Sequence, residues 1–255
     1  MPNLRPLRVG CVKYLNARPL ISVWNRDVIF DHPSALCAQL ARGELDVALV
    51  SSFEFLRNPI YRIVDGISIA SDGAVYSVIV AYHGNFADVK QIALDPAAET
   101  SGNLLRCLLA ELNLNPKIGS TSSDSPESAQ LLIGDQAIRF RQKRANHFQF
   151  WDLGDQWKKL FHVPFVYALW LVRPEVQNAA EIADRLRALR DQNLANIDKV
   201  IARETEFDPE FCRRYYGEHL RFSFGEEEKG GLALFAELCR KHELLPKREL
   251  VLDLV

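Results

Sequence analysis

The chain has 255 residues, 48% of them hydrophobic, which is enough to bury a sizeable core as one large domain or two smaller lobes. Its 31 basic and 33 acidic residues give a formal net charge of -2, so no overall field of one sign favours nucleic acid or a membrane surface. We therefore expect a small-molecule ligand, with no nucleic-acid and no membrane partner. The oligomeric state is left open.

The five cysteines are widely separated and lack the paired spacing of a zinc site, and most lie in apolar runs. We expect buried, reduced thiols and no metal. The first ten residues lack the charged-then-apolar design of a signal peptide, and no uninterrupted apolar stretch reaches membrane-spanning length. The expected location is the cytoplasm.

The N-terminal segments alternate strands with polar turns. A buried strand is predicted over Leu7–Val12, followed by a loop at Asn16–Pro19. Helical spacing follows over Pro33–Gly43, with the glycine as stop signal. A second buried strand, Asp46–Val50, ends in Ser51-Ser52, at the carboxyl end where open α/β sheets place ligands.

The middle of the chain repeats this order. Strands are predicted over Ile67–Ala70, Val75–Tyr82 and Gln91–Asp95. Thr100 or Ser101 is then expected to cap a helix, leaving backbone N–H groups free to bind an anion.

Farther along, a helix start at Ser125–Gln130 precedes strands over Leu131–Asp135 and Phe165–Val172. Helical periodicity then dominates over three segments, Ala179 to about Ala202, Asp208 to about Tyr216, and Glu226 to about His242.

The order of these elements is compatible with two lobes. Lobe one would comprise residues 1–83 plus 174–255 and lobe two residues 84–173, with crossings near His83 and Arg173 and a cleft between the lobes. A single doubly wound domain is also compatible, because periodicity does not fix which strands share a sheet.

No Gly-rich phosphate loop, HExxH, G-x-S-x-G or paired CxxC occurs, which leaves polar loop residues as candidates. Asn16 either contacts a ligand or shapes a turn. Arg18 either clamps a carboxylate or is solvated. Ser51 and Ser52 either bind a ligand or cap a helix. Ser77, in an apolar stretch, needs a hydrogen-bond partner.

Thr100 and Ser101 combine the roles of helix cap and anion site. Asp95, Asp135 and Asp152 stand at predicted strand ends, where a carboxylate acts as a general base or satisfies loop N–H groups. We keep Asp135 as a substrate-binding candidate.

Taken together, an ordered set of segments between residues 8 and 172 resembles the chorismate dehydratase family of the futalosine route to menaquinone. The segments are Tyr14–Leu20, Gly43–Val50, Val75–Val78, Leu131–Ala137, Asp152–Trp157 and Val163–Trp170. The resemblance implies an α/β fold with two lobes like type II periplasmic binding proteins. It also implies a carbon–oxygen lyase, or hydro-lyase, that dehydrates chorismate to 3-[(1-carboxyvinyl)oxy]benzoate without a metal or organic cofactor.

By position, Asn16 and Ser77 match the Asn and Ser that the family uses at the reacting centre, where the substrate's own side-chain carboxylate helps to take the proton. The resemblance also implies that further polar residues line the cleft and hold carboxylates: Ser51, Ser52, Thr100 and Ser101, with Arg18 assisting. Two departures stand out. Glu99 replaces a common arginine, and His162 lies where Thr-Gly is usual.

Two other functions remain open. One is a non-catalytic cytoplasmic protein that binds or senses chorismate-like carboxylates. The other is a related futalosine-pathway enzyme such as the 1,4-dihydroxy-6-naphthoate synthase.

Overall fold

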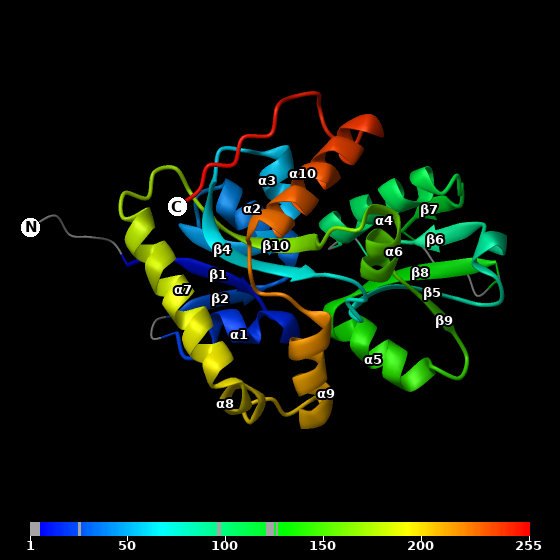
Figure 1. The fold of residues 1–255 in the computed structure, drawn as a ribbon, viewed down its shortest axis with the longest axis horizontal. Coiled ribbons are helices and arrows are strands. Elements are labelled where there is room, and N and C mark those ends of the chain that lie inside the picture. Colours follow the sequence, from blue (N-terminus) through cyan, green and yellow to red (C-terminus); the bar gives the residue numbers. More distant parts are fainter. Residues whose placement is uncertain (1–5, 25–26, 96–97, 121–124, 126) are drawn as a thin grey trace, which may run out of the picture.

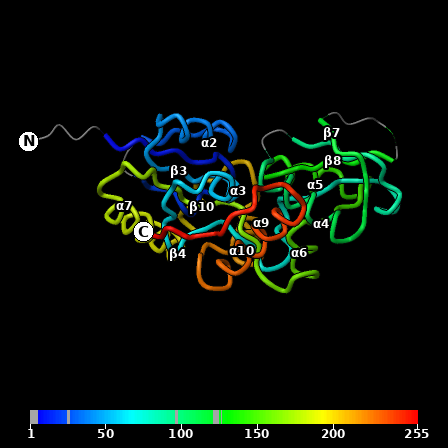
Figure 2. The backbone as a smooth tube through the Cα atoms, turned by 90° about the horizontal axis from the view of Figure 1, so that it is seen from above, coloured from blue at the N-terminus to red at the C-terminus, as the bar shows by residue number. Residues whose placement is uncertain are grey.

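A computed structural model describes residues 6–24, 27–95, 98–120, 125 and 127–255. Its strands form two five-stranded sheets, which lie side by side along the long axis in both Figure 1 and Figure 2. Two separate sheets fit the two-lobed arrangement and not the single doubly wound one.

The first sheet has strands β1 (Val9–Val12), β2 (Val28–Asp31), β3 (Val47–Ser51), β4 (Arg62–Ser71) and β10 (Phe165–Val172). Their order is β2-β1-β3-β10-β4, with β1 parallel to β2 and β3, and β10 antiparallel to β3 and β4. Every residue of β3 and β10 is buried. Such continuous apolar runs are typical of strands covered on both faces of a sheet.

The second sheet has strands β5 (Val78–Tyr82), β6 (Gln91–Ala93), β7 (Lys117–Gly119), β8 (Ser128–Ile133) and β9 (Gln149–Asp152). Their order is β7-β6-β8-β5-β9, with β6 parallel to β7 and β8, and β5 antiparallel to β8 and β9.

The strand pairing shows that the chain passes between the lobes at other positions than predicted. Strand β5 belongs to the second sheet although it precedes the expected boundary at residue 83, and β10 belongs to the first sheet although it precedes the boundary at residue 173. The chain therefore crosses at residues 72–77 and 162–164. The predicted boundaries fell one strand late because each apolar strand looks the same whichever sheet it joins.

Ten α-helices surround the described parts of the sheets: α1 (Arg18–Ile21), α2 (Pro33–Ala41), α3 (Ser52–Arg57), α4 (Glu99–Glu111), α5 (Gly134–Arg144), α6 (Leu153–Phe161), α7 (Ala179–Ala195), α8 (Ile197–Ile201), α9 (Pro209–Arg214) and α10 (Glu226–Lys241). Two 3₁₀ turns and a π-helical turn complete the elements: η1 (Leu15–Ala17), η2 (Phe86–Asp88) and η3 (Tyr215–His219). Helix α7 packs on α1 and β4, whereas α10 contacts both β10 and α4. The C-terminal helices thus cover the first sheet and reach the second lobe (Figure 1). Within the described ranges, no helix is long and apolar enough to cross a membrane.

Several local predictions differ from the structure. The segment Asn16–Pro19 forms η1 and the start of α1 in place of a loop. The helix start predicted at Ser125–Gln130 is wrong, because β8 begins at Ser128; Pro126 lies outside the described residues. Neither Thr100 nor Ser101 is the cap of α4, which begins one residue before them at Glu99. Local sequence preferences are weak and locate the ends of elements poorly, so differences of this kind are expected at element boundaries.

Candidate active site

A cleft lies between the two sheets, and the space between its walls measures about 580 Å³ with the open mouth included. Five residues expected at the site line it: Asn16, Ser51, Ser77, Thr100 and Ser101. Arg18, Ser52 and Asp135 are not among the lining residues. The remaining polar or aromatic lining residues are Tyr14, Glu99 and Tyr167.

Asn16 lies in η1, directly after the carboxyl end of β1. Its Oδ1 atom is buried and has no hydrogen-bond partner among the described residues. A buried carboxamide oxygen without a partner is uncommon in folded proteins. Because the side chain lines the cleft, a ligand hydroxyl or amide is a suitable partner.

Ser77 lies at the end of the crossing segment that leads into β5, and its side chain is 1% exposed. The preceding Tyr76 has a φ of 68°, a left-handed conformation that is rare outside glycine. The Asp152 carboxylate holds this backbone by accepting hydrogen bonds from Val75 N at 3.0 Å and Tyr76 N at 2.8 Å. Strain of this kind persists only where the surroundings fix it, and here they fix the position of Ser77.

Asp152 is itself tied into the second lobe. It caps α6 by accepting hydrogen bonds from Gly154 N and Asp155 N. Arg141 lies 3.3 Å from its Oδ2 atom and stacks over the Tyr76 ring at 4.2 Å. Burial raises the pKa of this carboxyl group, while the backbone hydrogen bonds and Arg141 oppose the rise. Asp152 thus anchors the crossing segment and does not line the cleft.

Ser51 and Thr100 meet across the cleft, since their hydroxyl oxygens lie in hydrogen-bonding contact. Phe53 N, in α3, also donates to Thr100 Oγ1 at 3.2 Å. Ser52 Oγ donates to the Val166 carbonyl of β10 at 2.7 Å and lies at the longer distance of 3.5 Å from Thr100 Oγ1, and its side chain is fully buried. Ser51 and Thr100 therefore join the lobes at the wall of the cleft, whereas Ser52 has a structural role.

Arg18 and Asp135 do not reach the cleft as expected. The Arg18 side chain is about half exposed and its guanidinium lies 3.8 Å from Glu204. Asp135 Oδ1 accepts a hydrogen bond from Leu15 N at 2.8 Å, which links the start of α5 to η1. Its role in the structure is to join the lobes next to Asn16, because its carboxylate is used by the backbone of the opposite lobe.

Asp135 also makes stability depend on pH. Burial raises its pKa to about 6, although the Leu15 hydrogen bond acts in the opposite direction. The folded chain therefore binds the proton more tightly than the unfolded chain, in which the pKa is about 4. The free energy of unfolding should fall as pH rises between these two values, by about 3 kcal/mol from this group.

We expect Asp135→Asn to remove this dependence, because the amide oxygen can still accept from Leu15 N but never ionises. Urea unfolding of both proteins at pH 4.5, 5.5 and 7 measures the difference. Parallel pH curves for the two proteins would contradict the prediction.

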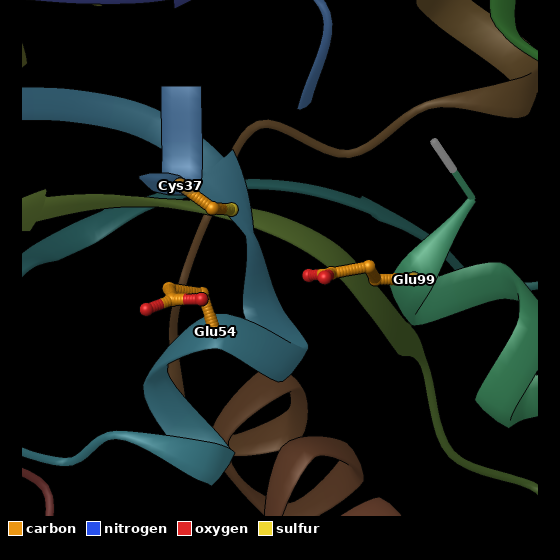
Figure 3. Close-up of side chains that lie close together, drawn as sticks. All are labelled: Cys37, Glu54 and Glu99. Carbon is orange, nitrogen blue, oxygen red and sulfur yellow. The ribbon is translucent and has the colours of Figure 1, made fainter. Parts of the chain in front are cut away.

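Cys37, Glu54 and Glu99 offer a sulfur and two carboxylates within 4.8 Å of one another, and Figure 3 shows the side chains facing one another. The set does not fit a metal ion. Arg57 already donates to Glu54 at 2.7 Å and to Glu99 at 2.8 Å. Burial, followed by the charge of Glu54, raises the pKa of the Cys37 thiol, so the metal-binding thiolate is disfavoured. The cluster is an ion-paired wall beside the cleft.

Sequence reasoning missed several tyrosines of the site. Tyr14 lies in a motif segment and Tyr167 in a strand predicted to be buried, and neither was among the candidate site residues, yet both line the cleft. The Tyr167 hydroxyl lies 3.2 Å from Ser71 Oγ. Tyr167 stands in an apolar strand, and a buried tyrosine hydroxyl needs a polar partner. That need was the signal in the sequence that could have pointed to Tyr167 as a site residue.

The menaquinone biosynthesis family model matches residues 7–241. The chain belongs to this family. A chorismate dehydratase from Thermus thermophilus is 28% identical over 259 residues, covering 92% of this chain and 95% of that protein. The resemblance stated from the motifs is thereby confirmed.

Solved structures similar to this menaquinone biosynthesis family member confirm the fold class. A protein from Archaeoglobus fulgidus has a TM-score of 0.72 at 18% identity, covering 94% of this chain and 98% of that one. The periplasmic aliphatic sulphonate binding protein from Escherichia coli has a TM-score of 0.64 at 14% identity, covering 98% and 91%. A Candida albicans protein described as having the generic periplasmic binding protein fold has a TM-score of 0.58 at 11% identity, covering 96% and 92%. The fold is the two-lobed, periplasmic-binding-protein-like α/β fold.

Proposed function

We propose that this protein is a hydro-lyase that dehydrates chorismate to 3-[(1-carboxyvinyl)oxy]benzoate in menaquinone biosynthesis. The observation that carries the proposal is that Asn16 and Ser77, on separate segments, line one cleft. The 28% identity to a chorismate dehydratase, spread over most of both chains, supports the same reaction.

The chemistry asks for orientation more than for a strong catalyst. Loss of the ring proton at the ether-bearing carbon and of the neighbouring hydroxyl group releases one water and leaves an aromatic ring. Asn16 can both donate to and accept from the departing hydroxyl group, while Ser77 can donate to it. Fixed donors of this kind stabilise charge that develops in the transition state.

The substrate carries two carboxylates, and none of the described lining residues is Lys or Arg. We assign their binding to hydroxyl groups and to the first turn of α4, where Thr100 and Ser101 lie. The N–H groups of a first helical turn have no intrahelical partners and favour negative charge. Glu99 is held by Arg57, so we keep the substrate's own side-chain carboxylate as the proton acceptor.

The test is incubation of purified protein with chorismate, followed by chromatography with mass detection. We expect a product lighter by one water and absorbing as a substituted benzoate. Unchanged chorismate at high enzyme concentration would refute the lyase assignment.

A second candidate, a binding or sensing protein for chorismate-like carboxylates, is favoured by one observation. The Glu99 carboxylate lines the cleft where the resembled family commonly has an arginine, and its buried Oε2 atom, without a partner among the described residues, can accept from a ligand hydroxyl group but supplies no positive charge for the reaction. Calorimetric binding of chorismate without conversion would favour this candidate over the enzyme.

A further inference from the structure

The π-helical turn η3 contacts both segments that carry the proposed reacting groups. The Tyr215 hydroxyl donates to Ser77 Oγ at 2.7 Å. The Tyr216 hydroxyl donates to the Leu15 carbonyl at 3.1 Å, one residue before Asn16. His219 Nδ1 lies 2.8 Å from the Ala74 carbonyl, on the same crossing segment as Ser77. Single π-helical turns are rare and occur frequently at functional sites.

Tyr215 constrains the hydroxyl group of Ser77. A serine hydroxyl has one proton to donate and two lone pairs that accept. Because Tyr215 donates to the oxygen, the serine proton remains available for a ligand in the cleft that Ser77 lines. The Tyr215 side chain is fully buried, and burial raises the pKa of its hydroxyl, so it stays a donor throughout the neutral range.

Tyr216 constrains the position of Asn16 through its neighbour. The Leu15 carbonyl accepts from Tyr216, while the Leu15 N–H donates to Asp135 Oδ1 at 2.8 Å. Both backbone polar groups of Leu15 are thus held by side chains from distant parts of the chain. The backbone that carries Asn16 is fixed from two sides.

The ring of Tyr215 is itself held in place. It stacks on Phe211 of α9 with the centroids 5.6 Å apart and an interplanar angle of 12°. Phe211 also contacts the Tyr76 ring, with the centroids 5.1 Å apart. Removing only the hydroxyl of Tyr215 should therefore leave the ring and the crossing segment where they are.

We propose that Tyr215 and Tyr216 are positioning residues of the active site: the hydroxyl of Tyr215 orients the Ser77 hydroxyl toward the substrate, and that of Tyr216 fixes the η1 backbone beside Asn16. The proposal rests on the proposed function, since it assigns how that site is held. Neither tyrosine is among the residues that line the cleft, so each acts through its partner.

The experiment is a double-mutant cycle on turnover with Tyr215→Phe, Ser77→Ala and the combined variant. Tyr215→Phe should lower kcat between about 10- and 100-fold, the range expected when a reacting group is misplaced, with KM within about twofold of wild type. In the Ser77→Ala background the same change should cost nothing further in kcat, because Tyr215 acts only through that hydroxyl. A merely structural role would instead give equal losses in both backgrounds.

Tyr216→Phe supplies a second arm, tested in the same way with and without Asn16→Ala. Tyr82→Phe is the matched control: its hydroxyl is also hydrogen-bonded, to Gln149 Oε1 at 3.1 Å, but between β5 and β9 and outside the cleft lining. It should leave kcat unchanged.

Three outcomes would each overturn the assignment of Tyr215. They are a wild-type kcat for Tyr215→Phe, additive losses of kcat in the Ser77 cycle, and an equal loss of kcat in Tyr82→Phe. The same three outcomes in the second cycle apply to Tyr216. If the wild-type protein does not turn over chorismate, the proposed function and these roles are overturned together. If the wild-type protein turns over chorismate but the losses in the cycles are additive, only the positioning roles are overturned.

Discussion

Ser77→Ala should lower kcat by about 100-fold or more, the loss typical when one fixed donor at the reacting centre is removed. The variant also leaves the buried Tyr215 hydroxyl without the partner it has at 2.7 Å, so its free energy of unfolding should fall by about 1–3 kcal/mol. Steady-state kinetics with chorismate and urea unfolding measure the two effects separately.

Asn16→Asp tests the other side of the cleft. The carboxylate keeps the shape of the amide but loses its two donors and adds negative charge beside a substrate with two carboxylates. We expect a loss in kcat/KM of about 100-fold or more.

The matched control for Ser77 is Ser68→Ala. Ser68 is also fully buried, and its hydroxyl donates to the Ser223 carbonyl, outside the cleft lining. It should lose comparable stability and keep wild-type kcat. Near-wild-type rates in both Ser77→Ala and Asn16→Asp would show that the roles assigned by resemblance are wrong.

Gly134→Ala should impair turnover by holding the lobes apart. Gly134 has a φ of 57°, and a Cβ atom there would lie 2.9 to 3.0 Å from the ring of Tyr14 on the opposite lobe. The left-handed conformation alone costs an L-residue about 1–2 kcal/mol. To relieve the contact, either Tyr14 moves or the cleft opens, and misplacement of this size costs about 100-fold in rate.

Kinetics, together with small-angle scattering of the wild-type and variant proteins, measure this effect. Gly119→Ala is the control, because Gly119 ends β7 in the same lobe and a Cβ atom there meets nothing within 4 Å. Wild-type kcat/KM in Gly134→Ala would mean that the contact with Tyr14 yields without moving either lobe.

Two buried strands and one helix end were predictable from the sequence. The apolar run that became β10 was predicted with both of its ends correct and the run that became β3 with an error of one residue, and both strands are buried throughout. Gly43 was expected just past a helix, and it follows α2 with a φ of 73°. These features depend on neighbours in the chain, so local patterns are sufficient to predict them.

The sequence by itself determined the family, the two-lobed fold that the family implies, and the polar segments that hold Asn16 and Ser77. Tertiary structure alone decided which strands share a sheet, and it placed the Asp135 carboxylate on the Leu15 backbone of the opposite lobe and outside the cleft lining. It also decided the partners of Ser77 and Leu15, which lie 138 and 201 residues away in the chain. The physical reason is range: periodicity records what a residue packs against within a few turns, whereas a hydrogen bond between distant side chains exists only once the lobes and C-terminal helices have packed together.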